Sequence, residues 1–311
     1  MINFRISSLS AMGVLWLVTA AWAFSFSLIG VYLSGHVDNY LAVFIRVGLA
    51  FLLFLPLLRP DTLSLPKSAA LTAIGGIQIG ATYLLLYHAF SYLSVPEVLL
   101  FTIFTPLYIT LFDELILGRR RLPIRWWIAS VVAVIGAGLI RYNQVSSNAL
   151  MGFLLIQAAN LCFAAGQVAY KRLPLGELAQ QPRVFGWFFL GATLVSGIGV
   201  IFFADWSKVP SSALQWGILI WLGMGASGLG YLAWNMATKK VNTGQLASMN
   251  NMMIPTGILV NFLFWNDDVD WLRLLLGGSI IGLSLWICSP NRDAVFDPGE
   301  RQSGRTKPER Q

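Results

Sequence analysis

The sequence predicts an all-α membrane protein with ten transmembrane helices, arranged as two inverted five-helix repeats. The chain is 56% hydrophobic and only 11% charged, with a mean hydropathy of +0.67, whereas a soluble domain carries about a quarter charged residues. Its apolar stretches have the length that crosses a bilayer as a helix. Cutting the chain at its middle gives two halves that start on opposite sides of the membrane.

Short polar or basic turns separate the predicted spans. The first apolar run is long enough to span and has no small-residue cleavage motif after it, so we expect it to remain as a helix. Pro106 in the fourth span and Pro255 in the ninth each remove a backbone hydrogen bond, which predicts a kink and a hinge. The predicted limits are residues 12–33, 40–58, 68–90, 96–117, 125–142, 149–170, 184–204, 213–237, 244–265 and 270–288.

Local composition supports individual spans. Glycines between residues 75 and 80 and the run Gly223–Gly228 place small residues in the third and eighth spans, where they let helices approach closely. The fifth span begins with the pair Trp126–Trp127 directly after a basic loop. Tryptophans in that position are typical of the headgroup level of a membrane.

Positive charge is divided unequally between the two sides of the predicted bundle. If the N-terminus is cytoplasmic, 17 of the 21 Lys and Arg residues lie inside, and only Arg141, Lys208 and Arg273 lie outside. This positive-inside pattern predicts a multi-pass protein of the bacterial inner membrane with both termini cytoplasmic. Residues 290–311, rich in Pro, Gly and charge, are expected to form a disordered cytoplasmic tail. The basic clusters lie between spans rather than on one face, so we expect no nucleic-acid partner.

An internal duplication is indicated by a cut near Asn148, which gives repeats at residues 1–147 and 148–289. The stretch Tyr83–Ala89 resembles Tyr231–Ala237, and each is followed by a polar turn and a helix with a central proline. Their shared order favours duplication over chance. Repeats of opposite orientation are typical of secondary transporters, whose substrate sites lie near the bilayer midplane.

Several stretches resemble a known transporter family. They are Trp22–Ser27, Gly35–Asp38, Arg46–Ala50, Thr105–Thr110, Ile135–Gly138 and Asn250–Met252. Together with the predicted helices, these stretches resemble the EamA branch of the drug/metabolite transporter superfamily over nearly all of the chain except its tail. Within that branch, they are similar to bacterial transporters of biotin. The resemblance implies an inner-membrane carrier that takes up biotin by alternating access. The alternative is an exporter of amino acids or related metabolites with the same fold.

Two charged residues are predicted within or at the edge of the membrane. Arg46 lies about six residues into the second span, on the order of 9 Å deep at 1.5 Å per residue. A charge in hydrocarbon is a functional candidate by default, and a guanidinium can receive a carboxylate through paired hydrogen bonds; the alternative is that Arg46 snorkels to the interface. Glu97 either stabilises a helix N-terminus or belongs to the site, as an ion-pair partner of Arg46 or as a proton carrier.

Amide and aromatic side chains complete the predicted site. Asn160 and Gln167 lie near one face of the sixth helix, and Asn250 and Asn251 precede Pro255 on the ninth. Such amides either bond neighbouring helices or bind the ureido ring of a biotin-like substrate. The aromatic rings either wall an apolar pocket or pack in the core. The predicted substrate-binding residues are Arg46, Glu97, Trp22, Tyr83, Tyr87, Asn160, Gln167, Trp234, Asn250 and Asn251.

The remaining polar groups carry no catalytic pattern. Asp113 and Glu114 are expected to be solvated partners of the cluster Arg119–Arg121. The chain departs here from the family it resembles, whose members often carry a glutamate at the cytoplasmic end of the fourth helix, where this chain has Arg119 and Arg120. The sequence has no HExxH motif, no Walker loop and no Ser/His/Asp grouping, so we expect no enzyme, no cofactor and no metal. Cys162 and Cys288 are expected to be core thiols. The expected partners are a small-molecule substrate and membrane lipid, and the chain is expected to act as a monomer or a homodimer.

Overall fold

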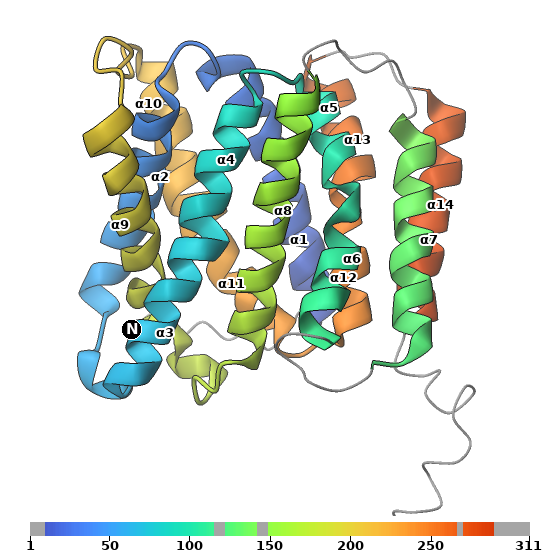
Figure 1. Ribbon diagram of the computed structural model, residues 1–311, viewed down its shortest axis with the longest axis horizontal. Coiled ribbons are helices and arrows are strands. Elements are labelled where there is room, and N and C mark those ends of the chain that lie inside the picture. The colour runs from blue at the N-terminus through green and yellow to red at the C-terminus, as the bar shows by residue number, and fades with distance from the viewer. Residues whose placement is uncertain (1–9, 115–121, 142–148, 266–269, 289–311) are drawn as a thin grey trace, which may run out of the picture.

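The chain folds as a bundle of helices that stand side by side, as the computed structural model shows (Figure 1). The structure describes residues 10–114, 122–141, 149–265 and 270–288. Within these ranges every regular element is a helix, and no strand occurs. The all-α prediction is therefore confirmed, while the predicted tail at 290–311 lies outside the described residues.

Among the described residues, six helices are long and apolar enough to cross a membrane. They are formed by α1 (Ala11–Leu28) with Ile29–Leu33; α2 (Asn39–Phe54) with Leu55–Leu57; α3 (Leu65–Gly75), Gly76–Ala81 and α4 (Thr82–Ala89); α8 (Ala149–Arg172); α9 (Phe185–Phe203); and α10 (Ala213–Ile220), Trp221–Leu229 and α11 (Gly230–Thr238). The shorter apolar helices α7 (Ile124–Arg141) and α14 (Trp271–Ile287) pack together at one edge of the bundle (Figure 1). Short 3-10 turns at Pro60–Thr62 and Leu178–Arg183 lie between helices.

The fourth and ninth predicted spans are each interrupted just before their proline. In the fourth, α5 (Val95–Phe101) is followed by the 3-10 turn Thr102–Phe104 and then by α6 (Thr105–Leu111). In the ninth, α12 (Thr243–Asn251) ends at Met252, and α13 (Met253–Trp265) follows. Pro106 and Pro255 lack an N–H, and their rings crowd the carbonyl four residues earlier, so a regular helix is interrupted at these points.

Amide side chains bond the carbonyls at the first of these breaks. The carbonyl of Phe101 accepts hydrogen bonds from Gln157 Nε2 at 3.0 Å and from Asn160 Nδ2 at 2.9 Å. The carbonyl of Ile103 accepts one from Asn251 Nδ2 at 3.0 Å, which links the break in one half of the chain to the break in the other. Because a buried carbonyl without a partner costs about 1–3 kcal/mol, these amides stabilise the interrupted helices.

Glycines bring α3 and α9 into direct backbone contact. A Cβ atom on Gly75 would overlap the carbonyl of Phe188, and a Cβ atom on Gly191 would overlap the carbonyl of Thr72. Lipid is as apolar as the helices, so close van der Waals packing of this kind replaces the hydrophobic effect as the force between helices. The two glycines therefore set the spacing of this helix pair.

Asp113 is not a solvated carboxylate, so the prediction for this residue was wrong. Asp113 is fully buried, accepts a hydrogen bond of 2.6 Å from Arg172 Nε, and is bonded by the hydroxyl of Thr243. Glu114 accepts from the indole N–H of Trp127 at 2.6 Å. Tertiary packing brings the ends of α6 and α8 and the start of α12 together, so these carboxylates find partners far away in sequence. The cluster Arg119–Arg121 lies outside the described residues.

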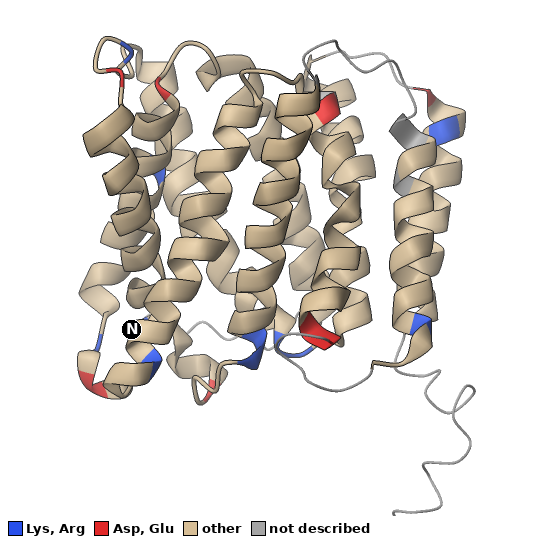
Figure 2. Ribbon diagram, in the orientation of Figure 1, with Lys and Arg blue, Asp and Glu red and all other residues tan. Residues whose placement is uncertain are grey.

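Lys and Arg gather at one end of the bundle, the end at which α1 begins (Figure 2). The described members of this group are Arg59, Lys67, Arg125, Lys171, Arg172, Arg183, Lys239 and Lys240. At the opposite end lie Lys208 and Arg273, and Arg46 lies between the two ends. The charged groups of the described helices thus avoid the apolar middle of the bundle, with Arg46 as the exception.

Replacing Asp113 by alanine is expected to destabilise the bundle. The change leaves Arg172 without its carboxylate and Thr243 without its acceptor, and breaking a buried pair costs up to about 3–5 kcal/mol, less here because Arg172 is partly exposed. The apparent Tm in detergent should fall by several degrees. Asp270→Asn is the control, because asparagine can still cap α14 through the backbone N–H of Arg273 while the exposed pair with the Arg273 side chain is lost, and such pairs contribute about 0–1 kcal/mol. Equal shifts in the two variants would contradict the structural role of Asp113.

Candidate functional site

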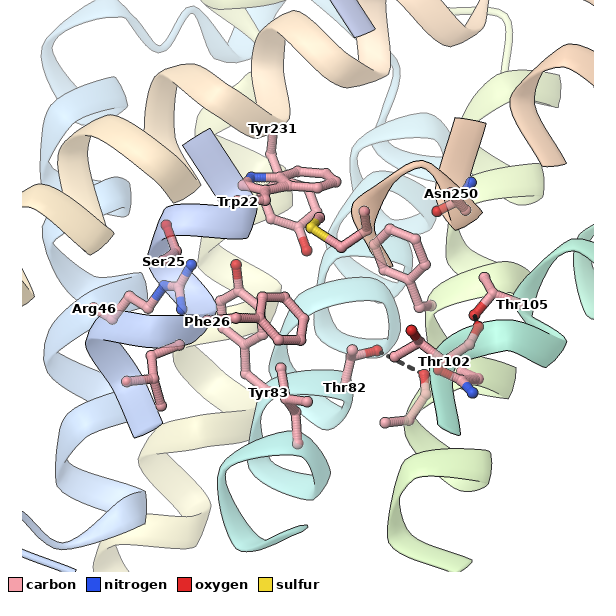
Figure 3. A pocket seen from close by; sticks show the side chains of 16 residues that line it. Trp22, Ser25, Phe26, Arg46, Thr82, Tyr83, Thr102, Thr105, Tyr231 and Asn250 are labelled. Carbon is pink, nitrogen blue, oxygen red and sulfur yellow. Dashed lines mark hydrogen bonds between the residues drawn. The ribbon is translucent and has the colours of Figure 1, made fainter. Parts of the chain in front are cut away.

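A cavity lies among the helices, and both halves of the chain line it (Figure 3). About 710 Å³ of space that no atom fills lies within it, including the part that is open at its mouth. Its lining comes from the middle of α1 and α2, from α4, from the break before α6, and from α8, α11, α12 and α13. The lining residues are Trp22, Ser25, Phe26, Ile29, Arg46, Thr82, Tyr83, Leu86, Thr102, Thr105, Ala159, Asn160, Phe163, Tyr231, Asn250 and Met253.

Arg46 enters the cavity from α2 and does not reach the membrane surface. Its side chain is buried, with 2% of the residue exposed. Its Nε donates to Ser227 Oγ at 2.7 Å, and its Nη1 donates to the hydroxyl of Tyr87 at 3.3 Å. The guanidinium carbon lies 4.1 Å from the ring centroid of Tyr83. The snorkelling alternative is therefore excluded, and the guanidinium is held by hydroxyl dipoles and a ring face.

No carboxylate neutralises this guanidinium within the part of the chain that the structure describes. The ion pairs found there are Arg172 with Asp113 and Arg273 with Asp270. The Nη2 atom of Arg46 has no hydrogen-bond partner among the described residues, and the side chain lines the cavity. A buried cation with a free donor that faces a cavity attracts an anion, because an unpaired charge is costly in surroundings of low dielectric.

Aromatic rings wall the cavity beside the guanidinium. The ring centroids of Trp22 and Tyr231 lie 4.6 Å apart, and Phe163 lies 6.2 Å from Trp22. The indole N–H of Trp22 donates to the carbonyl of Ala226 at 2.9 Å, which fixes the orientation of the ring. The cavity therefore offers a rigid apolar surface to the body of a ligand.

Five of the predicted site residues line the cavity, and four others lie next to its lining or bond a helix break. Trp22, Arg46, Tyr83, Asn160 and Asn250 line it. The other four contact neighbours of the cavity: Tyr87 bonds Arg46, Gln167 bonds Asn250, Trp234 packs on Trp22 with 4.8 Å between ring centroids, and Asn251 bonds Ile103.

Glu97 does not lie among the lining residues. It occupies the third position of α5 and its carboxylate accepts from the backbone N–H and the hydroxyl of Ser94, both at 2.8 Å. This is a capping box, in which the acid satisfies a free N–H at the start of a helix. Glu97 and Arg46 form no ion pair. The placement of Glu97 agrees with the helix N-terminus alternative.

Several lining residues were missing from the predicted site, among them Ser25, Thr82, Thr102, Thr105, Phe163 and Tyr231. Features of the sequence could have predicted some of these lining residues. Ser25, Phe26 and Ile29 follow Trp22 at three, four and seven residues, which places all four on one face of α1. Thr102 and Thr105 flank the helix break before Pro106, the kind of position where irregular backbone lines a cavity in a membrane protein.

These features define a class of protein. A helical bundle of membrane-spanning length, with an internal cavity lined by helices from early and late in the sequence and a cation in that cavity without a carboxylate partner among the described residues, is typical of a carrier for a small solute.

Comparison with known proteins specifies the family. Residues 10–142 match the EamA-like transporter family. The chain is 48% identical over 273 residues to a probable biotin transporter of Pseudomonas aeruginosa, covering 87% of this chain and 94% of that one. It is 46% identical over 276 residues to the biotin transporter of Escherichia coli K12, covering 89% and 92%. The chain belongs to the EamA-like transporter family, and its relatives are transporters, not enzymes.

A solved crystal structure supports the same fold. It matches with a TM-score of 0.69 at 16% sequence identity, over 88% of this chain and 96% of that chain. At this level of identity the likeness concerns the arrangement of helices alone.

The variant Glu97→Gln is expected to transport at close to the parental rate. Glutamine serves at the same position of a capping box, whereas it can neither carry a proton nor pair with Arg46. Initial uptake rates in whole cells, corrected for the amount of protein in the membrane, measure this effect. A loss of transport at normal protein level would place Glu97 in the coupling machinery after all.

Proposed function

We propose that this protein is a secondary transporter that takes up biotin across the bacterial inner membrane by alternating access. The observation that carries the proposal is the unpaired guanidinium of Arg46 in a cavity walled by aromatic rings, in a chain closely related to biotin transporters. Biotin combines one carboxylate with a compact bicyclic ring, so it offers an anion for Arg46 and an apolar body for the wall.

The charge of the cavity favours a monocarboxylate over an amino acid. None of the described lining residues is an aspartate or a glutamate. An amino acid would bring an ammonium group as well as a carboxylate, and the ammonium would have no counter-ion beside Arg46. Desolvating that group without a partner is costly, which argues against the alternative of an amino-acid exporter.

We further propose ten transmembrane helices in two inverted repeats, at residues 1–147 and 148–289. Two features recur in corresponding places of the halves: the π-helical segments Gly76–Ala81 and Trp221–Leu229 within the third and eighth spans, and the breaks before Pro106 and Pro255. The gathering of Lys and Arg at the end where α1 begins supports cytoplasmic termini by the positive-inside rule (Figure 2).

Alternating access would use the two breaks as hinges. The bond from Asn251 to the carbonyl of Ile103 joins them at the level of the cavity, so movement of one broken helix is transmitted to the other. Hinges in membrane proteins need local backbone groups to be satisfied by side chains. The amides of Gln157 and Asn160 supply such bonds at the first break.

Uptake of labelled biotin tests the proposal directly. In a strain that lacks every other biotin importer, cells that express this protein should accumulate label at a rate that saturates with concentration. Excess unlabelled biotin should abolish the uptake, and excess amino acids should leave it unchanged. Equal accumulation with and without the protein would reject biotin as the substrate, and competition by amino acids alone would favour the exporter function.

Arg46→Ala is expected to weaken biotin uptake by about 10–100-fold. Hydrogen bonds to charged groups contribute about 1.5–3 kcal/mol, and the variant removes both the bonds and the charge. The variant should also lose the parental preference for biotin over its uncharged methyl ester. Arg273→Ala, which alters an exposed arginine at a helix end, is the control and should transport normally. If Arg46→Ala retains the preference for the acid, the carboxylate is bound elsewhere.

A further inference from the structure

The amide nitrogens that line the cavity have used all their hydrogens within the protein. Asn160 Nδ2 donates to the carbonyl of Phe101 at 2.9 Å and to Gln157 Oε1 at 3.5 Å. Asn250 Nδ2 donates to the carbonyl of Leu246 at 2.8 Å and to Gln167 Oε1 at 3.2 Å. A side-chain amide has two N–H donors, so neither nitrogen has a hydrogen left for a ligand.

These contacts also settle which way each amide points. If Asn160 or Asn250 were rotated to exchange oxygen and nitrogen, its carbonyl oxygen would face a backbone carbonyl, and two acceptors would repel each other. The Oδ1 atom of each asparagine is therefore the amide atom that is not used in these bonds. Neither oxygen has a hydrogen-bond partner among the described residues, and both side chains line the cavity.

Two threonine hydroxyls of the lining also donate their hydrogens within the protein. Thr102 Oγ1 donates to the carbonyl of Leu99 at 2.7 Å, and Thr105 Oγ1 donates to the carbonyl of Thr102 at 2.8 Å. A hydroxyl has a single hydrogen, so these two groups present lone pairs alone to the cavity. These four lining side chains therefore offer acceptors and no free donor to the cavity; Gln167, whose Nε2 has no partner, is buried behind Asn250 and does not line it.

The acceptors and the cation lie on different sides of the cavity. Figure 3 shows Arg46 and Ser25 on one side, and Thr102, Thr105 and Asn250 on the other, with Trp22 and Tyr231 above the space between them. The cavity thus has a cationic donor end, an aromatic wall and an acceptor end.

We propose that the acceptor end, made by the Oδ1 atoms of Asn160 and Asn250, binds N–H donors of the substrate and so fixes its orientation. The inference rests on the proposed function. With the carboxylate of biotin at Arg46, the bicyclic ring lies along Trp22 and Tyr231, and the ureido N–H groups donate to the two asparagine oxygens.

This arrangement determines which ligands the site rejects. A dicarboxylate of similar length would place a second set of acceptors against the asparagine oxygens, and the two would repel. A ligand without N–H groups would leave both oxygens buried and unpaired. Sites built around a substrate N–H or O–H discriminate strongly against analogues that lack it, because their own polar groups then lose their partners.

Competition against labelled biotin uptake tests the inference. Desthiobiotin keeps the carboxylate and both ureido N–H groups, so it should compete nearly as well as biotin. Biotin methylated on both ureido nitrogens should compete at least about tenfold less well, since one lost buried hydrogen bond already costs about 1–3 kcal/mol. If the dimethylated compound matches biotin while the methyl ester of biotin fails, the acceptor end is refuted and the role of Arg46 stands. If biotin is not transported at all, the proposed function fails, and the inference with it.

Variants separate hydrogen bonding from the bulk of the added methyl groups. Asn160→Leu and Asn250→Leu keep the approximate size of the side chain and remove the acceptor together with the bonds to the carbonyls of Phe101 and Leu246. Loss of those bonds should affect both ligands alike, whereas loss of the acceptor should lower the preference for biotin over dimethylated biotin. Asn261→Leu is the control, because Asn261 accepts from Ser27 and does not line the cavity. Its preference should remain parental. An unchanged preference in both cavity variants, with protein present in the membrane, would overturn the inference.

Discussion

A guanidinium buried within a membrane-spanning bundle must be solvated by the protein, because the hydrocarbon of the lipid offers neither dipoles nor counter-ions. Around Arg46 this solvation comes from hydroxyls, with Ser227 and Tyr87 as direct partners and Tyr83 beneath the charge. These groups come from α4 and from the segment before α11, so the charge holds both halves of the chain around one point. Dipoles stabilise the cation without neutralising it, which leaves it able to bind an anion from the cavity.

The polar groups on the other side of the cavity arise from a different constraint. A proline within a membrane helix frees backbone carbonyls that lipid cannot bond, and side chains must supply the missing donors. Gln157, Asn160 and Asn251 do this at the break before Pro106. Once Asn160 has donated both of its hydrogens, its oxygen remains without a partner among the described residues, on a side chain that lines the cavity. An amide that bonds a free carbonyl at a helix break can thus also offer its oxygen to a ligand.

Close packing elsewhere lets these two features coexist. Gly75 and Gly191 bring α3 and α9 into backbone contact, and the buried Asp113 joins the ends of α6 and α8 to the start of α12. None of these three residues lines the cavity: the glycines fix the spacing of two helices within their spans, and Asp113 joins helix ends. The interior can then contain an open space, because the surrounding helices are fixed by contacts that do not involve it.

Composition and the length of the apolar runs determined by themselves that this chain is an all-α membrane protein, since hydrocarbon requires each backbone group to be bonded within the protein, and runs of about 20 apolar residues achieve this as helices. Proline chemistry likewise predicted the interruptions before Pro106 and Pro255, and the cost of a charge in lipid singled out Arg46. Only the tertiary structure decided that Glu97 caps α5, that Asp113 is buried, and that Asn250 lines the cavity while Asn251 bonds a neighbouring helix. Helical periodicity shows which residues share a face, but the partner of that face depends on how distant segments pack.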